Sequence, residues 1–218
     1  EAYEQLAAEC YVVTTPGGAT RVAGCNAGPP RSAAPEDPTI YRYDFRPGRP
    51  DLNEFPRSEW LRSARRAIGT APADRLGYLD GHGVPELRSA LSAYVDRARA
   101  TSTDPADIIV TSGFIQSLQL IARVMLRSGQ IRVAVEDPWH EDYRRALVAA
   151  GLEVVPVPVD DEGLIVDRLA DVEPAVVVTT PAHQYPSGAV MSPARRAQLL
   201  DWAATADGLI VEDDYDAE

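Results

Sequence analysis

Polar side chains that could bind a ligand gather at four places along the chain, each directly after a short apolar run. The four segments are Thr111-Ser112-Gly113, residues 136–140, residues 180–188 and residues 212–215. In parallel sheets, ligands bind beyond the carboxyl ends of the strands. We therefore expect these segments to converge on one pocket.

The first segment suits a phosphate. A Ser112-Gly113 turn that opens a helix at Phe114 presents free backbone N–H groups and the positive end of the helix dipole. Ser112 could instead be an ordinary helix cap, and a motif of this kind on its own favours that interpretation. From the residues alone, both interpretations stay open.

The acidic and histidine residues allow a weaker, metal-binding interpretation. Glu212, Asp213 and Asp214 could hold Mg²⁺, or they could simply solvate the end of a strand. No second carboxylate cluster has a comparable position, so we do not predict a metal. His140 and His183 could also be ligands, but a lone histidine in a loop is more often a surface or packing residue.

The segments between these sites alternate between apolar runs and amphipathic stretches. Strands are predicted at residues 108–110, 133–135, 154–159, 175–178 and 209–211. Helices are predicted at residues 57–68, 85–99, 114–126, 141–150 and 193–204. Because the strands are apolar throughout, they should be buried on both faces. This predicts an α/β fold with a mostly parallel sheet and helices on both faces.

A small element is predicted to precede this body. Residues 2–9 have the spacing of a short helix, and residues 11–22 form a hairpin pattern around Pro16-Gly17-Gly18. Residues 25–38 are rich in proline and small side chains, which is typical of a linker. The larger body is expected to begin near Ile40.

Composition excludes several classes of protein. The 218 residues carry a net charge of −12, which argues against a surface built to bind nucleic acid phosphates or anionic lipid. The sequence contains no transmembrane run and no signal-peptide pattern. Cys10 and Cys25 are too few for a disulfide scaffold. We expect a cytoplasmic protein with no membrane partner.

All 21 basic residues are arginine, and the chain contains no lysine. The sequence opens without methionine in a helix-like pattern and stops soon after a strand-like run. We therefore expect it to be a fragment of a longer protein.

Taken together and in this order, the motifs resemble the large domain of fold-type I pyridoxal 5′-phosphate (PLP) aminotransferases. The forms His183-Gln184-Tyr185-Pro186-Ser187-Gly188 and Glu212-Asp213-Asp214-Tyr215-Asp216 are most similar to the MocR branch of GntR-family transcriptional regulators. Asp44-Phe45-Arg46-Pro47-Gly48, Gly77-Tyr78 and Pro85-Glu86-Leu87-Arg88 fit the same branch. Ala2-Tyr3-Glu4-Gln5-Leu6 and the hairpin resemble the end of a winged-helix recognition helix and its wing.

The resemblance implies three parts. Residues 1–24 would be the end of the winged-helix DNA-binding domain, and residues 25–39 the linker. Residues 40–218 would be an aminotransferase-like domain that is incomplete at its C-terminal end.

The resemblance also implies that PLP is the cofactor and which residues contact it. Ser112 and Gly113 form the turn at the cofactor phosphate, and Phe114 and Ile115 would offer it backbone N–H groups. Asp213 would face the pyridine nitrogen and keep it protonated, which makes the ring an electron sink.

Four further contacts follow from the resemblance. Tyr215 would donate to the ring hydroxyl. His140 takes the place of an aromatic that stacks on the ring; it covers less area, and Trp139 could substitute for it. Tyr185 stands where many aminotransferases have asparagine. For His140 and Tyr185, packing roles remain equally open. Tyr78 would reach the phosphate of a neighbouring subunit, which implies a homodimer.

Fold-type I chemistry begins with a covalent bond between PLP and a lysine amine, and this chain has none. The resemblance places that lysine after Glu218, so no catalytic residue is predicted within the chain. Three hypotheses stay open. The parent is a transcriptional regulator that binds DNA and a small amino compound as effector, or it is a working aminotransferase, or the chain is an inactive relic.

Overall fold

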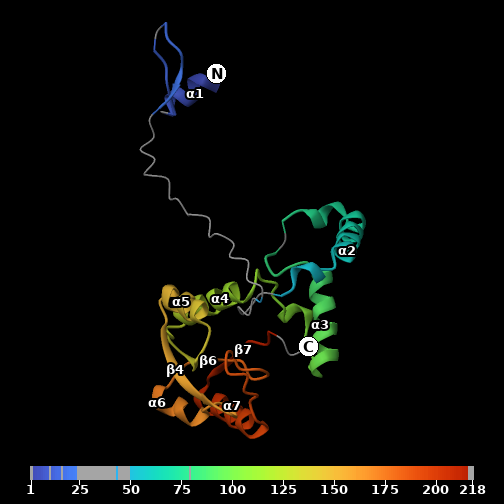
Figure 1. Cartoon of the computed structure of the whole chain (residues 1–218), viewed down its shortest axis with the longest axis vertical. Helices are drawn as coiled ribbons and strands as arrows, with labels where there is room; N and C mark the ends of the chain where they lie inside the picture. The colour runs from blue at the N-terminus through green and yellow to red at the C-terminus, as the bar shows by residue number, and fades with distance from the viewer. Residues whose placement is uncertain are drawn as a thin grey trace. The chain divides into compact units, whose positions relative to one another are not determined.

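The computed structural model describes residues 2–9, 11–15, 17–23, 43, 50–78 and 80–215. The chain divides into two compact units, residues 1–64 and 65–218 (Figure 1). Helix α2 (Arg57–Thr70) crosses this boundary. Each unit is described by itself.

The first unit contains helix α1 (Ala2–Ala8) and a two-stranded antiparallel hairpin. Strand β1 (Val12–Val13) pairs with β2 (Arg21–Val22). The short 3₁₀ helix η1 (Leu52–Glu54) follows later in the chain. The predicted short helix and hairpin are thus confirmed. The whole predicted linker and the segment 44–48 lie outside the described residues.

The second unit is built on a five-stranded sheet with the order β5-β4-β3-β6-β7. Its strands are β3 (Arg132–Asp137), β4 (Glu153–Asp160), β5 (Gly163–Leu164), β6 (Val176–Thr179) and β7 (Leu209–Glu212). All neighbouring pairs are parallel except β4 and β5. This confirms the predicted mostly parallel sheet.

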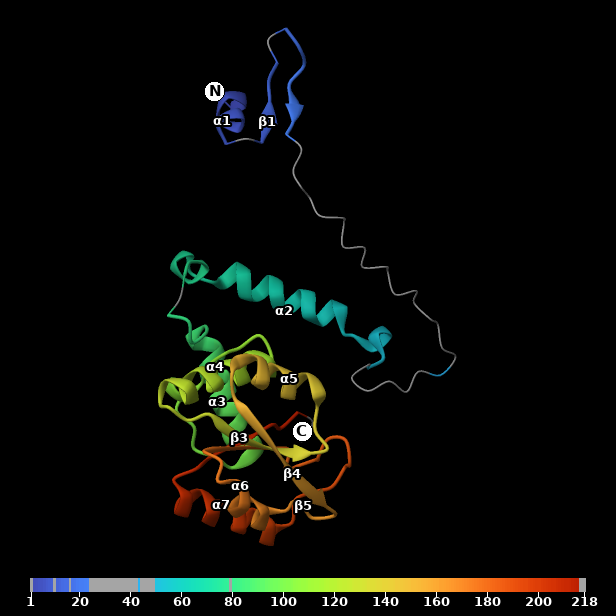
Figure 2. The ribbon, with the colours of Figure 1, turned by 90° about the vertical axis from the view of Figure 1, so that its left-hand side faces the viewer.

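Helices cover both faces of this sheet. Helices α4 (Phe114–Arg127) and α5 (Glu141–Ala150) lie on one face, and α6 (Leu169–Val172) and α7 (Pro193–Ala206) lie on the other (Figure 2). Side chains alternate between the two cores, as the period of a strand requires. Val133 and Val135 pack with α4 and α5, whereas Ala134 packs with α6 and α7. Burial on both faces explains why the strands read as unbroken apolar runs.

In the second unit, helix α3 and two 3₁₀ helices come before α4. Helix α3 (Pro85–Arg99) has proline at its start, as predicted, and lies between η2 (Ala73–Leu76) and η3 (Pro105–Asp107). A further 3₁₀ helix, η4 (Val166–Arg168), precedes α6.

The strand predicted at residues 108–110 is wrong. These residues join no sheet in the described structure, and the Val110 N–H donates instead to the His82 carbonyl at 2.8 Å. An apolar run becomes a strand only if a neighbouring strand pairs with it. In the parts of the chain that the structure describes, no helix is both long and apolar enough to cross a membrane.

Candidate active site

The carboxyl ends of β3, β6 and β7 meet at one edge of the sheet. The chain runs from central β3 to β4 on one side and then returns to β6 on the other side. Such a reversal of strand order is where α/β sheets bind ligands. At this edge the Asp213 N–H, just after β7, donates to the Thr179 carbonyl of β6 at 2.9 Å. The predicted convergence is therefore observed for these three strand ends.

Glu136 forms the buried centre of this edge. It lies near the end of β3 with only 2% of its surface exposed. Its Oε1 accepts from the Thr179 hydroxyl and from the Thr180 N–H, the latter at 3.1 Å. Its Oε2 accepts from the Thr180 hydroxyl and from the Gln184 amide, the latter at 3.2 Å. Four donors on two oxygens satisfy a buried, acceptor-only carboxylate.

Two of these donors also hold the backbone of Tyr185. The Tyr185 N–H donates to the Thr180 hydroxyl at 3.3 Å, and its carbonyl accepts from Gln184 Nε2 at 2.6 Å. The same Nε2 also lies 2.8 Å from the Pro138 carbonyl, two residues before His140, so its two N–H groups are shared among three acceptors. Part-buried hydrogen bonds thus connect the loop after β3 to the loop after β6.

Aromatic rings gather beside this network. The His140 ring stacks on Tyr143, with centroids 4.3 Å apart, and lies 5.5 Å from the Tyr185 ring. Tyr185 meets Tyr215 edge-on at 6.4 Å, and Phe114 meets Tyr143 at 5.1 Å. The structure therefore brings together four predicted site residues, Phe114, His140, Tyr185 and Tyr215. Tyr143 connects the first two.

Asp213 stands in an environment where burial and negative charge outweigh positive charge. Its pKa is raised from 3.8 to about 6, first by burial and then by the nearby carboxylates of Asp214 and Glu136; His140 acts in the opposite direction. Burial and the charge of Asp213 also raise the pKa of Tyr143. Arg99 forms an ion pair with Asp214, not with Asp213. Asp213 is therefore suited to a cationic ligand group.

The start of α4 corrects the simplest interpretation of Ser112. The helix cap is Gly113, with φ of 91° and no side-chain cap bond, so Ser112 does not cap the helix. The Ser112 N–H donates instead to Oε1 of Gln116. Phe114 and Ile115 occupy the first two helical positions, whose N–H groups have no partner within the helix. These groups are the ones expected to bind phosphate.

His140 and Tyr78 differ in how far the structure accounts for them. His140 caps α5, because its Nδ1 accepts from the Asp142 N–H at 3.3 Å, so it has a packing role beside any ligand role. Tyr78 is fully exposed. Its expected partner is a second copy of the chain, so its role stays a prediction.

Sequence reasoning assigned no role to Glu136, Tyr143, Thr180 and Gln184. Only Glu136 left a usable signal, since it is an acidic residue that directly follows the apolar run 133–135 within strand β3. A buried acid needs partners, and the threonines at and directly after the end of β6, Thr179 and Thr180, were available. Tyr143 gave no signal, because an aromatic on a helix face reads as core.

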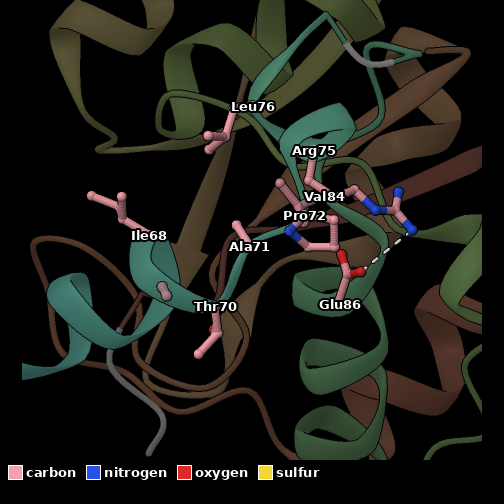
Figure 3. Close-up of a pocket in the computed structure, with 9 residues that line it drawn as sticks. Ile68, Thr70, Ala71, Pro72, Arg75, Leu76, Val84 and Glu86 are labelled. Carbon is pink, nitrogen blue, oxygen red and sulfur yellow. Dashed lines mark ion pairs between the residues drawn. The ribbon is translucent and has the colours of Figure 1, made fainter.

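A cavity of about 470 Å³ lies elsewhere, between the end of α2, η2 and the start of α3 (Figure 3). It is lined by Ala67, Ile68, Thr70, Ala71, Pro72, Arg75, Leu76, Val84 and Glu86. Arg75 and Glu86 form an ion pair at 3.4 Å there. The cavity adjoins the first turn of α3, whereas Arg99, at the opposite end, pairs with Asp214. A 15-residue helix is about 20 Å long, so the cavity is separate from the polar strand ends.

Among the described residues, no three His, Cys, Asp or Glu side chains converge as metal ligands would. The alternative of Mg²⁺ at Glu212, Asp213 and Asp214 therefore gains no support from their arrangement.

The sequence is similar to curated transcriptional regulators along its whole length. It is 33% identical to the uncharacterized HTH-type transcriptional regulator YdeL of Bacillus subtilis, covering 100% of this chain and 48% of that protein. It is 32% identical to the probable rhizopine catabolism regulatory protein MocR of Rhizobium meliloti, covering 99% of this chain and 48% of that protein. The chain thus spans about half the length of the curated relatives that it matches.

The fold is similar to solved aminotransferases. The kynurenine aminotransferase of Pyrococcus horikoshii, solved in complex with PMP, superposes with a TM-score of 0.64 at 29% identity. The match covers 73% of this chain and 41% of that one. A profile of the family described as aminotransferase class I and II matches residues 50–215. On this match, the chain belongs to the aminotransferase class I and II family, whose members depend on PLP.

Proposed function

We propose that this chain contributes the PLP-binding part of the effector domain of a MocR-type transcriptional regulator. The observation that carries the PLP site is Asp213, a half-buried carboxylate at the end of β7 whose pKa is raised to about 6 beside an aromatic cluster. A protonated pyridine nitrogen would supply the positive charge that Asp213 lacks.

The residues present fit PLP at three points. Asp213 would hold the proton at the ring nitrogen, and the Phe114 and Ile115 N–H groups would take the phosphate. Tyr215 would donate to the ring hydroxyl. When bound, PLP supplies an electron-withdrawing ring and an aldehyde that reacts with amines. The chain has no lysine, so its own side chains would hold PLP without a covalent bond.

The regulator assignment is supported by coverage. The two regulators match 99–100% of the chain, whereas the aminotransferase structure covers 73% of it. We infer that α1 and the hairpin belong to a winged-helix DNA-binding domain and that residues 25–39 connect it to the PLP domain. The partners would be promoter DNA, a small amino compound as effector and a second copy of the chain, which Tyr78 would reach.

Equilibrium dialysis of the 218-residue chain against PLP tests the site. We expect saturable binding, which Asp213→Asn weakens at least tenfold and the exposed control Asp161→Asn leaves unchanged. Equal binding by all three proteins would refute the role of Asp213. The absence of any saturable binding would refute the site as a whole.

Mobility shifts test the regulator assignment. The gene product that contains this chain should shift DNA from its own promoter, with an affinity that falls steeply with salt. Failure with and without PLP would refute the assignment. Transamination is the second candidate, favoured by the fold of the aminotransferase with PMP. Steady turnover near the enzyme median of about 10 s⁻¹ would support it instead.

A further inference from the structure

The strongest unexplained feature of the molecule is the buried carboxylate of Glu136. Removing a carboxylate from water is costly unless hydrogen bonds compensate for it. Here four donors do so, and they come from Thr179, Thr180 and Gln184. None of these groups takes part in the ligand contacts proposed above. The role of this network is therefore to be sought in its other contacts.

Each of the three residues that donate to Glu136 also forms a hydrogen bond that holds a loop residue facing the proposed ring. The Thr179 carbonyl accepts from the Asp213 N–H at 2.9 Å. The Thr180 hydroxyl accepts from the Tyr185 N–H at 3.3 Å. Gln184 donates to the carbonyls of Tyr185 and Pro138, and Pro138 leads into the loop of His140. Three ring-facing residues on three different loops are thus connected to one carboxylate.

We propose that Glu136 is a positioning residue that holds Asp213, Tyr185 and His140 around the ligand ring and adds a second negative charge beside it. The site then selects a cationic heteroaromatic ring over a neutral ring of the same shape. The inference rests on the proposed PLP site and deepens it, because it names the property of the ring that is selected.

The charges around Asp213 support the second half of this proposal. Asp214 and Glu136 both raise the pKa of Asp213, and His140 lowers it. Burial and then the charge of Asp213 in turn raise the pKa of Tyr143. Arg99 offsets the Asp214 charge through their ion pair, whereas the partners of Glu136 are neutral hydroxyl, amide and backbone groups. The Glu136 charge is therefore the one that is not balanced by a cation.

Two substitutions separate position from charge. Glu136→Gln removes the charge and keeps the shape of the side chain. Thr180→Val removes one hydroxyl that joins Glu136 to Tyr185 and keeps the charge. The probes are PLP and its 1-deaza analogue, in which a C–H replaces the ring nitrogen, and the tryptophan fluorescence of the chain reports the dissociation constant of each.

We expect wild type to bind PLP at least about tenfold more tightly than the deaza analogue. Glu136→Gln should reduce this ratio several-fold. Thr180→Val should weaken both ligands by a similar factor and leave the ratio unchanged. A second readout is the titration of Asp213 by carbon-13 NMR without ligand. Its midpoint should fall in Glu136→Gln and stay constant in Thr180→Val.

An unchanged ratio and an unchanged Asp213 titration in Glu136→Gln would overturn the proposal. Should that variant not fold, the wild-type ratio decides, and equal binding of PLP and the deaza analogue would overturn the proposal. If wild type binds neither probe, the proposed PLP site and the ring selection both fail. The titration of Asp213 without ligand then still shows whether Glu136 acts on it.

Discussion

Replacing Asp213 by asparagine should stabilise the ligand-free chain at neutral pH. The substitution keeps the size of the side chain and removes a carboxylate whose pKa rises from 3.8 to about 6 on folding. A pKa difference of about 2 corresponds to about 3 kcal/mol, at about 1.4 kcal/mol per pKa unit. Asp213 is only half-buried and water screens its charge, so we expect about 1–2 kcal/mol.

The increase in the free energy of unfolding caused by Asp213→Asn should grow as the pH rises. Because the pKa of Asp213 is raised in the folded chain, the folded chain keeps a proton that the unfolded chain has already lost between pH 3.8 and about 6. Below that window both states are protonated and the carboxylate costs nothing. Above it the full cost applies. The advantage of Asp213→Asn should therefore be near zero at the acid end and reach its maximum above about pH 6.

Urea unfolding followed by tryptophan fluorescence measures this difference between pH 4 and 8. Asp161→Asn, at an exposed position in the turn between β4 and β5, is the matched control and should change the free energy of unfolding little at any pH. A destabilised Asp213→Asn variant, or a gain that does not change with pH, would refute the electrostatic account of this site.

Two further predictions concern backbone and charge. Gly83→Ala should lower the free energy of unfolding by about 2–4 kcal/mol, because φ is 108° and the new Cβ would lie 2.5 Å from Val110 Cγ2; chemical denaturation measures this. Arg99→Gln should raise the pKa of Asp213 further, because it leaves the Asp214 charge unpaired; carbon-13 NMR measures this.

Each of these predictions has its own control. Gly69→Ala lies in helix α2 with open space around the new Cβ. It should instead raise the free energy of unfolding by at most about 1 kcal/mol. Arg145→Gln lies on the exposed face of α5 and should leave Asp213 unchanged. An unchanged free energy of unfolding in Gly83→Ala would contradict the close approach to Val110. An unchanged pKa of Asp213 in Arg99→Gln would contradict the role of the ion pair between Arg99 and Asp214.

Most of the sheet could be predicted from sequence because its strands are short apolar runs between clear turns. Residues 133–135 and 209–211 were predicted as strands and lie in β3 and β7. Residues 108–110 have the same composition but no partner strand among the described residues. The local pattern of apolar residues indicates that a segment is buried, whereas its pairing into a sheet depends on whether another strand lies beside it.

The candidate site was predictable in outline but not in its interior. Asp213 directly follows β7, and Tyr185 lies in the loop that follows β6. Because the carboxyl ends of parallel strands meet at one edge of the sheet, the sequence predicts that these two residues lie near each other. That Glu136 accepts from residues 43 to 48 positions away depends on the register of β3 against β6, which composition does not encode. The capping role of His140 was missed for a related reason, since it is set by the local backbone at the start of α5.

The sharing of one carboxylate by four donors restricts how this part of the sequence can vary. Replacing Glu136 alone leaves several buried donors without an acceptor, and replacing Thr180 alone leaves one oxygen short of a donor. A second substitution then removes groups that have already lost their partners, so it should cost less than it would alone. Positions 136, 179, 180 and 184 should therefore change together or not at all, and double-mutant cycles among them should be strongly non-additive.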